Sequence, residues 1–327
     1  MLSLFRTNQA YAGLFLLVYA LLLQLPMLLG GAPAPPAATG GYLGEWVQSW
    51  VTERSFWALL LPVVLVFIQG LQANVLVTRH RMSRTITQFP GLFLILVWAL
   101  VPTFCWFHPV QLANVALLFG LLSLGRLYKR DEAAVPLFNA GAWLGLSSLF
   151  YAQYLLFLPA FLIGVGVLRR PDVRSLVQLT TGLLLLYFLT GSWLYFRGEL
   201  PVFLEAQFGG FTLVQGQPWG ITDGVGLGVL GLLLLLLLVG SGWLVRLLNI
   251  EGSKEVTIQY WLLLLAPIVV LLAGPVDVAV AQTVTVPLGI LLGLAFILFS
   301  PRRATLFHFL LLVVALLPDL LVLANVL

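Results

Sequence analysis

The chain has few charged residues. Only 9% of its 327 residues are Asp, Glu, Lys or Arg, whereas a soluble domain carries about 25%. Hydrophobic residues make up 61%, and the mean hydropathy is +1.06. This composition excludes a water-facing surface over most of the chain, so we expect a lipid bilayer to surround it. At about 20 residues per spanning helix, we predict one multi-pass domain over residues 1–327 and no soluble domain.

Cysteine is nearly absent, and histidine is sparse. Cys105 is the one cysteine, and the three histidines are His80, His108 and His308. A single cysteine excludes an intrachain disulfide and a cysteine-rich metal site. The histidines lack the spacing of a motif such as HExxH. The cofactor is unknown from the sequence, and a divalent cation held by carboxylates stays open.

A clustered basic face is also lacking. The chain has 16 basic and 12 acidic residues, for a net charge of +4, but the basic residues are spread between apolar runs. Binding of nucleic acid needs a basic patch or stripe, so we exclude nucleic acid as a partner. In a membrane protein, Lys and Arg instead report which loops face the cytoplasm.

The apolar runs predict an all-α fold with about 11 transmembrane helices. The runs cover residues 9–30, 56–77, 87–106, 110–126, 136–150, 153–168, 175–196, 225–247, 257–273, 282–300 and 304–326. Residues 136–168 are too long for one ordinary span and short for two. We interpret them as a tight hairpin of short helices whose ends are covered by neighbours, with one bent helix as the alternative.

The basic residues alternate between successive loops. If the N-terminus is inside, 14 of the 16 basic residues fall in cytoplasmic segments. These are Arg6, Arg79, Arg81, Arg84, Arg126, Lys129, Arg130, Arg169, Arg170, Arg174, Arg246, Lys254, Arg302 and Arg303. One missed span would invert every later loop. We therefore predict an inner (plasma) membrane protein with its N-terminus inside, its C-terminus outside, and longer external loops at 31–55 and 197–224.

The first external loop contains the stretch GYLGEWVQSWVTERSFW, residues 41–57. Its apolar residues recur at i, i+3, i+4, i+7 and i+8 from Leu43 to Val51, which is one face of a helix. Glu45 and Glu53 lie on the opposite face. The segment is too short and too polar to span, and tryptophan prefers the headgroup level. We predict a short amphipathic interfacial helix at about 43–54.

The same helix carries the candidate catalytic carboxylates. Glu45 and Glu53 would act as a general base or bind a metal ion. Arg54 and Arg197 are the two basic residues of the external side, and each stands near a carboxylate, Glu53 and Glu199 respectively. An arginine can hold a lipid phosphate by two hydrogen bonds. The alternative is that the helix only anchors the loop and its glutamates face water.

Four further residues are candidates in other segments. His108 lies at the external end of the third helix, in CWFHPV, and is a candidate for binding substrate. Asp319 follows Pro318 in the last helix, where a carboxylate near the centre costs about 2.5–3.5 kcal/mol, so it too is a binding candidate. Asp277, in AGPVDVAVAQ, is expected to be solvated in an external turn. Gln24 places an amide inside the first helix, where hydrogen bonding to another helix is typical.

Several segments resemble an uncharacterised integral-membrane family of the Bacteroidetes, a domain of unknown function. They are LFRTNQAYAG, NVLVTRHRMSR, LANVALLFGLLSLGRLYKRDEA and FNAGAWLGLSSLFYAQYLLFLPAFLIGVGVLRRPDVRS. The likeness covers about residues 1–200, with a weaker likeness beyond. It implies an inner-membrane protein and assigns no activity.

The architecture is also similar to that of the C-type glycosyltransferases, which use polyprenyl-phosphate sugars. The stretch AGAWLGLSSLFYAQYLLFLPAFLIG resembles a helix of those enzymes. The resemblance implies helices of uneven length and an essential acidic residue on an interfacial helix in the first external loop. The usual Asp-Asp or Asp-x-Asp/Glu pair is absent from residues 31–55, where Glu45 and Glu53 stand eight apart.

Three functional hypotheses follow. The first is a C-type glycosyltransferase-like enzyme that transfers a sugar from a polyprenyl-phosphate donor at the external face. The second is a transporter or flippase for a lipid-linked or small envelope substrate, with Asp319 and Gln24 along its path. The third is a non-catalytic scaffold of an envelope assembly. Loss of function on changing the external glutamates would favour the enzyme.

Overall fold

The computed structural model describes residues 2–6, 10–29, 40–51, 56–129, 132–170, 172–215, 220–275 and 277–323. The α-helices are α1 (Leu2–Phe5), α2 (Ala10–Leu28), α3 (Tyr42–Trp50), α4 (Phe56–Arg79), α5 (Phe89–Trp98), α6 (Pro109–Leu124), α7 (Ala134–Phe150), α8 (Leu158–Leu168), α9 (Val173–Phe196), α10 (Leu200–Phe208), α11 (Ile221–Val239), α12 (Ser241–Arg246), α13 (Ile250–Leu271), α14 (Thr285–Leu298) and α15 (Pro301–Leu323). Four 3₁₀ helices are η1 (Pro102–Cys105), η2 (Gly125–Leu127), η3 (Ala152–Phe157) and η4 (Val278–Val284), and two strands are β1 (Thr212–Gln215) and β2 (Ala273–Pro275).

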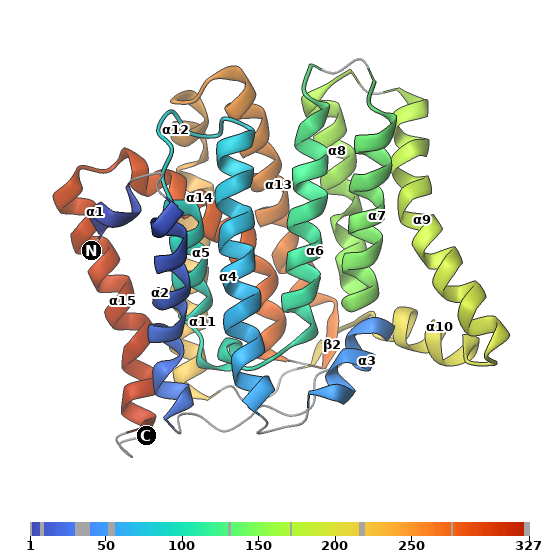
Figure 1. Cartoon of the computed structure of the whole chain (residues 1–327), viewed down its shortest axis with the longest axis horizontal. Helices are drawn as coiled ribbons and strands as arrows, with labels where there is room; N and C mark the ends of the chain where they lie inside the picture. The colour runs from blue at the N-terminus through green and yellow to red at the C-terminus, as the bar shows by residue number, and fades with distance from the viewer. Residues whose placement is uncertain are drawn as a thin grey trace.

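The long helices run side by side between two ends of the molecule (Figure 1). The upper end carries α12 and the connections after α4, α6, α8 and α14. The lower end carries α3, α10, β2 and the 3₁₀ helices η1, η3 and η4. Within the described residues, seven helical segments are long and apolar enough to cross a membrane by length and composition. The chain is therefore a multi-pass helical membrane protein. The total of 11 spans and their orientation stay predictions.

Two helices, α5 and α14, form the most buried part of the bundle. All ten residues of α5 are buried, as are most of those of α14. The helices approach closely because Gly289 and Gly293 of α14 lie against the backbone of Leu94 and Pro90 in α5. Small residues at such contacts let backbones meet and gain van der Waals packing in a membrane protein.

The predicted helix over 87–106 is broken. It ends at Trp98, and a separate 3₁₀ turn begins at Pro102. The cause is local: Val101 is extended, with φ −120° and ψ 116°, as residues before proline prefer. The hairpin over 136–168 consists of α7, the 3₁₀ helix η3 and α8, with an extended Tyr151 at the end of α7.

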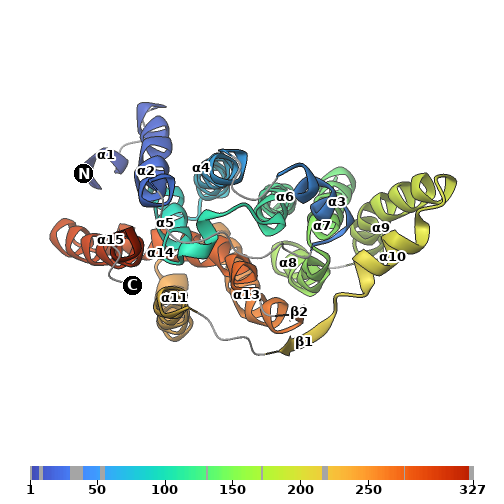
Figure 2. The ribbon, with the colours of Figure 1, turned by 90° about the horizontal axis from the view of Figure 1, so that it is seen from below.

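The region predicted as the external loop 197–224 contains regular structure. It holds α10 and strand β1, which pairs in parallel with β2 after α13. The fold is all-α apart from these two short strands, which were not predicted and which satisfy each other's backbone groups at the lower end. Figure 2 shows β1 and β2 side by side at the lower edge of the view, and α9 with α10 at its right.

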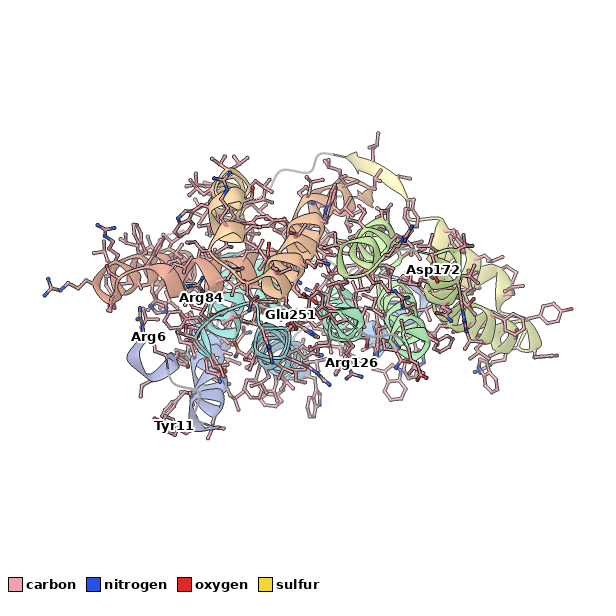
Figure 3. The ribbon with its side chains drawn as sticks, turned by 90° about the horizontal axis from the view of Figure 1, so that it is seen from above. Arg6, Tyr11, Arg84, Arg126, Asp172 and Glu251 are labelled. Carbon is pink, nitrogen blue, oxygen red and sulfur yellow. The ribbon has the colours of Figure 1, made fainter. Side chains whose placement is uncertain are left out.

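The two ends differ in charge. Apart from Arg197, every basic residue described by the structure belongs to a segment at the upper end. Figure 3 looks down on that end and shows Arg6, Arg84 and Arg126 together with Asp172 and Glu251. The loop alternation inferred from the sequence thus corresponds to two separate surfaces of the bundle.

Candidate functional site

Helix α3 is fixed to the lower ends of α6 and α7. The backbone N–H of Gly41 donates to the carbonyl of Phe150 at 3.0 Å. Gly44 lies against Phe150 and Pro109 so closely that a side chain there would collide with them. Glycine is required at this position because only a bare backbone can approach another backbone so nearly. The contact holds the next residue, Glu45, in a defined place at the lower end.

Glu45 lies in the first turn of α3. Its side chain is exposed, and the N-terminus of a helix favours a negative charge. Partial burial raises the pKa of the Glu45 carboxyl above its ordinary value, and a hydrogen bond from the backbone of Gly40 opposes the rise. A carboxylate with a raised pKa accepts a proton more readily at neutral pH. The direction of this shift is the one that a general base needs.

The predicted helix ends earlier than expected. Trp50 is its last residue, and Val51 is extended. The rings of Trp46 and Trp50 lie in contact, tilted by 56° with centroids 5.2 Å apart, and both are exposed, as expected for aromatic residues at a membrane interface. Glu53 and Arg54 lie outside the described residues, so their predicted roles stay predictions.

The region over residues 197–224 meets α3 at Tyr42. The Tyr42 hydroxyl donates to Oε2 of Glu199 at 3.1 Å, and its backbone N–H donates to Oε1 of Gln207 at 3.3 Å. Arg197 Nε lies 3.7 Å from Oε1 of Glu199, with the two side chains 57% and 43% exposed. The structure thus brings Arg197 and Glu199 to the helix that carries Glu45. Burial, and then the hydrogen bond to Glu199, raise the pKa of Tyr42.

His108 pairs with Asp277. The distance from His108 Nε2 to Asp277 Oδ2 is 3.1 Å, and the side chains are 3% and 22% exposed. The expectation of a solvated Asp277 is wrong, because the turn before η4 folds back onto the start of α6. Burial alone would raise the pKa of Asp277, but the charge and hydrogen bond of His108 and the N–H of Ala279 hold it below the ordinary value.

Both ring nitrogens of His108 are engaged. Nδ1 accepts the backbone N–H of Val110 at 3.2 Å, and Nε2 faces Asp277. The other carboxylate oxygen, Oδ1 of Asp277, accepts the N–H of Ala279 at 2.8 Å. A histidine held in this way joins α6 to η4 and has no nitrogen left to accept a substrate proton. The structure therefore favours a positioning role for His108, next to Pro109 and hence next to the contact that places Glu45.

A second layer of buried polar groups lies above this pair. Tyr154 donates to Oδ1 of Asn114 at 2.6 Å, and Asn114 Nδ2 donates to the carbonyl of Gln282 at 3.1 Å. Gln111 Nε2 donates to the carbonyls of Phe104 and Trp106, both at 3.0 Å. The contacts of Gln111 and Asn114 were not predicted from the sequence. Their signal was the recurrence of amides in the run that begins QLANVALL.

Asp319 is not near this region. Its helix α15 lies at the left side of the bundle, and α9 and α10 lie at the right side (Figures 1 and 2). The side chain of Asp319 lies outside what the structure describes. Among the described residues, no group of three or more His, Cys, Asp or Glu side chains is placed to hold a metal ion. The divalent cation stays open.

No protein-family model and no curated protein matches the chain. A crystal structure of ArnT from Cupriavidus metallidurans bound to undecaprenyl phosphate is similar, with a TM-score of 0.53 and 15% sequence identity. The match covers 92% of this chain and 63% of ArnT, so the chain spans less than two thirds of that protein. The chain therefore shares the fold of ArnT, as expected from the resemblance to the architecture of the C-type glycosyltransferases. The likeness to a Bacteroidetes family rests on the quoted segments alone.

Proposed function

We propose that the protein transfers a sugar from a polyprenyl-phosphate donor to an acceptor at its lower end, with Glu45 as general base. The observation that carries the proposal is the placement of Glu45 on α3, which is fixed by Gly44 to α6 and α7 and joined through Tyr42 to Glu199. The architecture shared with ArnT, a protein crystallised with undecaprenyl phosphate, supports the class of donor.

In the proposed reaction, Glu45 accepts a proton and Arg197 binds the phosphate. The acceptor hydroxyl gives its proton to Glu45 while its oxygen bonds to the anomeric carbon of the sugar. The bond from that carbon to the phosphate oxygen breaks, and its electron pair leaves with the lipid phosphate. Arg197 would bind the phosphate, as arginines do through paired hydrogen bonds, with Glu199 orienting the guanidinium. Arg54 and Glu53 stay candidates for the same phosphate and for a divalent cation.

The orientation of the chain decides where the reaction occurs. The lower end carries Arg197 and lacks the basic loops of the upper end, which under the positive-inside rule supports the prediction that it is the external side. We therefore place the reaction at the outer face of the inner membrane, where a lipid-linked sugar can meet the interfacial helix.

The first experiment measures activity after a change of Glu45. Removing a general base lowers the rate about 10²–10⁴-fold, so we expect Glu45→Gln to lose transfer to that extent, with Glu45→Asp retaining more. Glu205→Gln is the matched control, because Glu205 is an exposed glutamate on the neighbouring helix α10. Lipid analysis of a strain carrying Glu45→Gln should show accumulated polyprenyl-phosphate sugar. Full activity of Glu45→Gln would contradict the proposal.

The transporter hypothesis has less support. This hypothesis predicted that Gln24 lines a path for the transported substrate. The side chain of Gln24 is fully buried, and its Nε2 donates to the carbonyl of Cys105 at 2.9 Å. An amide used in this way ties α2 to the segment after α5. The scaffold hypothesis predicts that both Glu45→Gln and Arg197→Gln retain function, so the same experiment separates it from the enzyme.

A further inference from the structure

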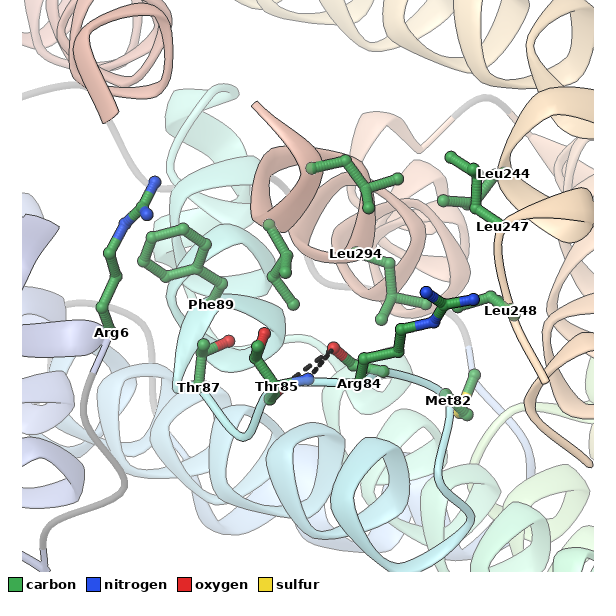
Figure 4. Close-up of a pocket in the computed structure, with 13 residues that line it drawn as sticks. Arg6, Met82, Arg84, Thr85, Thr87, Phe89, Leu244, Leu247, Leu248 and Leu294 are labelled. Carbon is green, nitrogen blue, oxygen red and sulfur yellow. Dashed lines mark hydrogen bonds between the residues drawn. The ribbon is translucent and has the colours of Figure 1, made fainter. Parts of the chain in front are cut away.

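The upper end contains a pocket of about 370 Å³ that has two arginines in an otherwise largely apolar lining. We call it the basic pocket. Arg6 stands on one side and Arg84 on the other, with Ser83, Thr85 and Thr87 among the lining residues (Figure 4). The basic pocket lies at the end of the bundle opposite to the proposed reaction site, so the proposed reaction does not account for it.

The polar groups of the basic pocket favour an anion. No described carboxylate lies within ion-pair distance of Arg6 or Arg84. Thr87 is only 7% exposed, and its hydroxyl has no hydrogen-bond partner among the described residues. A buried hydroxyl without a partner costs free energy, and an anionic oxygen in the pocket would supply one. Two arginines and a free hydroxyl form a donor set suited to a phosphate.

Below the basic pocket, an apolar groove of about 430 Å³ lies among α11, α13, α14 and α15. Its walls are almost entirely hydrocarbon and aromatic, and Leu236, Phe296, Phe307 and Leu311 are examples. Most of α11 is exposed on the outside of the bundle. The apolar groove therefore faces the hydrocarbon region of the membrane.

The two features are adjacent. Leu244 of α12 lines both the basic pocket and the apolar groove. Arg6 lines the pocket, and its Nη2 lies 3.5 Å from the carbonyl of Phe299, whose side chain lines the groove. A pocket with two arginines thus lies beside an apolar groove at the level where the predicted inner headgroups lie.

We propose that an anionic membrane phospholipid binds here, with its phosphate between Arg6 and Arg84 and one acyl chain in the apolar groove. The charge of the pocket selects an anionic headgroup, and the length of groove below it selects a lipid over free phosphate. Anionic lipids of the cytoplasmic leaflet are attracted to basic residues at this level. The site is distinct from the lower end and does not depend on the proposed transfer reaction.

Lipid retention tests the headgroup contact. The full chain is placed in nanodiscs with equal amounts of phosphatidylglycerol and phosphatidylcholine, and the lipids retained after extraction are counted by native mass spectrometry. We expect phosphatidylglycerol to be preferred. One basic residue near an anionic headgroup is worth about fivefold in binding, so Arg84→Ala and Arg6→Ala should each reduce retention by about that factor. Arg170→Ala is the matched control, because Arg170 is an exposed arginine of the same end outside the basic pocket.

A second pair of variants tests the acyl-chain contact. Ala295 lines the apolar groove, so Ala295→Phe should fill it and reduce retention while both arginines remain. Leu232→Phe is its control, because Leu232 is exposed on α11 outside the groove. Unchanged thermal unfolding midpoints would show that all variants fold. Equal retention of the two phospholipids, or an equal effect of Arg84→Ala and Arg170→Ala, would overturn the proposal. So would displacement of phosphatidylglycerol by an equimolar polyprenyl phosphate.

Discussion

A histidine–carboxylate pair stands at each end of the molecule, and the two pairs differ. At the lower end, His108 Nε2 lies 3.1 Å from Asp277, and backbone N–H groups hydrogen-bond to both partners. At the upper end, His80 Nδ1 lies 3.9 Å from Glu255. Glu255 is 2% exposed, and its Oε1 has no hydrogen-bond partner in the described part of the chain.

The difference follows from what surrounds each pair. Burial is the main cause that lowers the pKa of His80 to about 4, and the charges of Arg79 and Arg126 add to it. Asp277 instead keeps its charge, because His108 and the N–H of Ala279 outweigh its burial. The lower pair is thus an electrostatic connection between α6 and η4, whereas the histidine of the upper pair is neutral at physiological pH. A histidine beside a carboxylate therefore has a different electrostatic role at each end.

The largest effect on stability is expected from breaking the lower pair. Asp277→Asn should lower the free energy of unfolding by about 1.5–3 kcal/mol, the range for hydrogen bonds to charged groups. Thermal unfolding in detergent of Asp277→Asn, His108→Gln and the double variant gives the coupling energy between the two residues. Additive effects of the two single changes would show that the pair makes no joint contribution.

Acid titration separates the two ends. His80 binds a proton in the unfolded chain at about pH 6.5 but in the folded protein only at about pH 4. Because the unfolded state then binds more protons, stability should fall as the pH is lowered from 6.5 towards 4. His80→Gln should flatten this part of the curve. For Asp277, whose pKa is lowered in the folded protein, the loss begins only below its ordinary value of 3.8. A wild-type midpoint that stays constant from pH 6.5 to 4 would contradict the account of His80.

The smallest effect on stability is expected at the exposed pair. Arg197 and Glu199 are 57% and 43% exposed, and exposed ion pairs contribute about 0–1 kcal/mol. Arg197→Gln should therefore leave the unfolding midpoint almost unchanged while it weakens binding of the donor, measured as a rise in KM. A large loss of stability would mean that Arg197 holds the lower end together and is not free to bind phosphate.

Much of the fold could be predicted from the sequence. The apolar runs identified the helical segments, and the amphipathic repeat from Leu43 to Val51 identified α3, because both patterns depend on residues close together in the chain. The break at Pro102 was missed, although its cause is equally local. Strands β1 and β2 were missed because each is stabilised only by the other, and about 60 residues separate Thr212 from Ala273.

The candidate site was predicted only in part. Glu45, Arg197 and Glu199 were named as candidates, and the structure joins them through Tyr42, a contact between residues 42 and 199. The partner of His108 was not predicted, because Asp277 is 169 residues further along the chain. Charge and hydrophobicity show that such residues are unusual, but they do not show which of them meet.

The sequence by itself determined that this is a multi-pass helical protein, because so few charged residues cannot cover a water-facing surface, and that its basic residues alternate between loops. Only the tertiary structure decided that Gly44 fixes α3 beneath α6 and α7, that Asp277 pairs with His108, and that Arg6 and Arg84 line one pocket. The physical reason is range: composition and periodicity act through neighbours in the chain, whereas these contacts depend on how helices from distant segments pack.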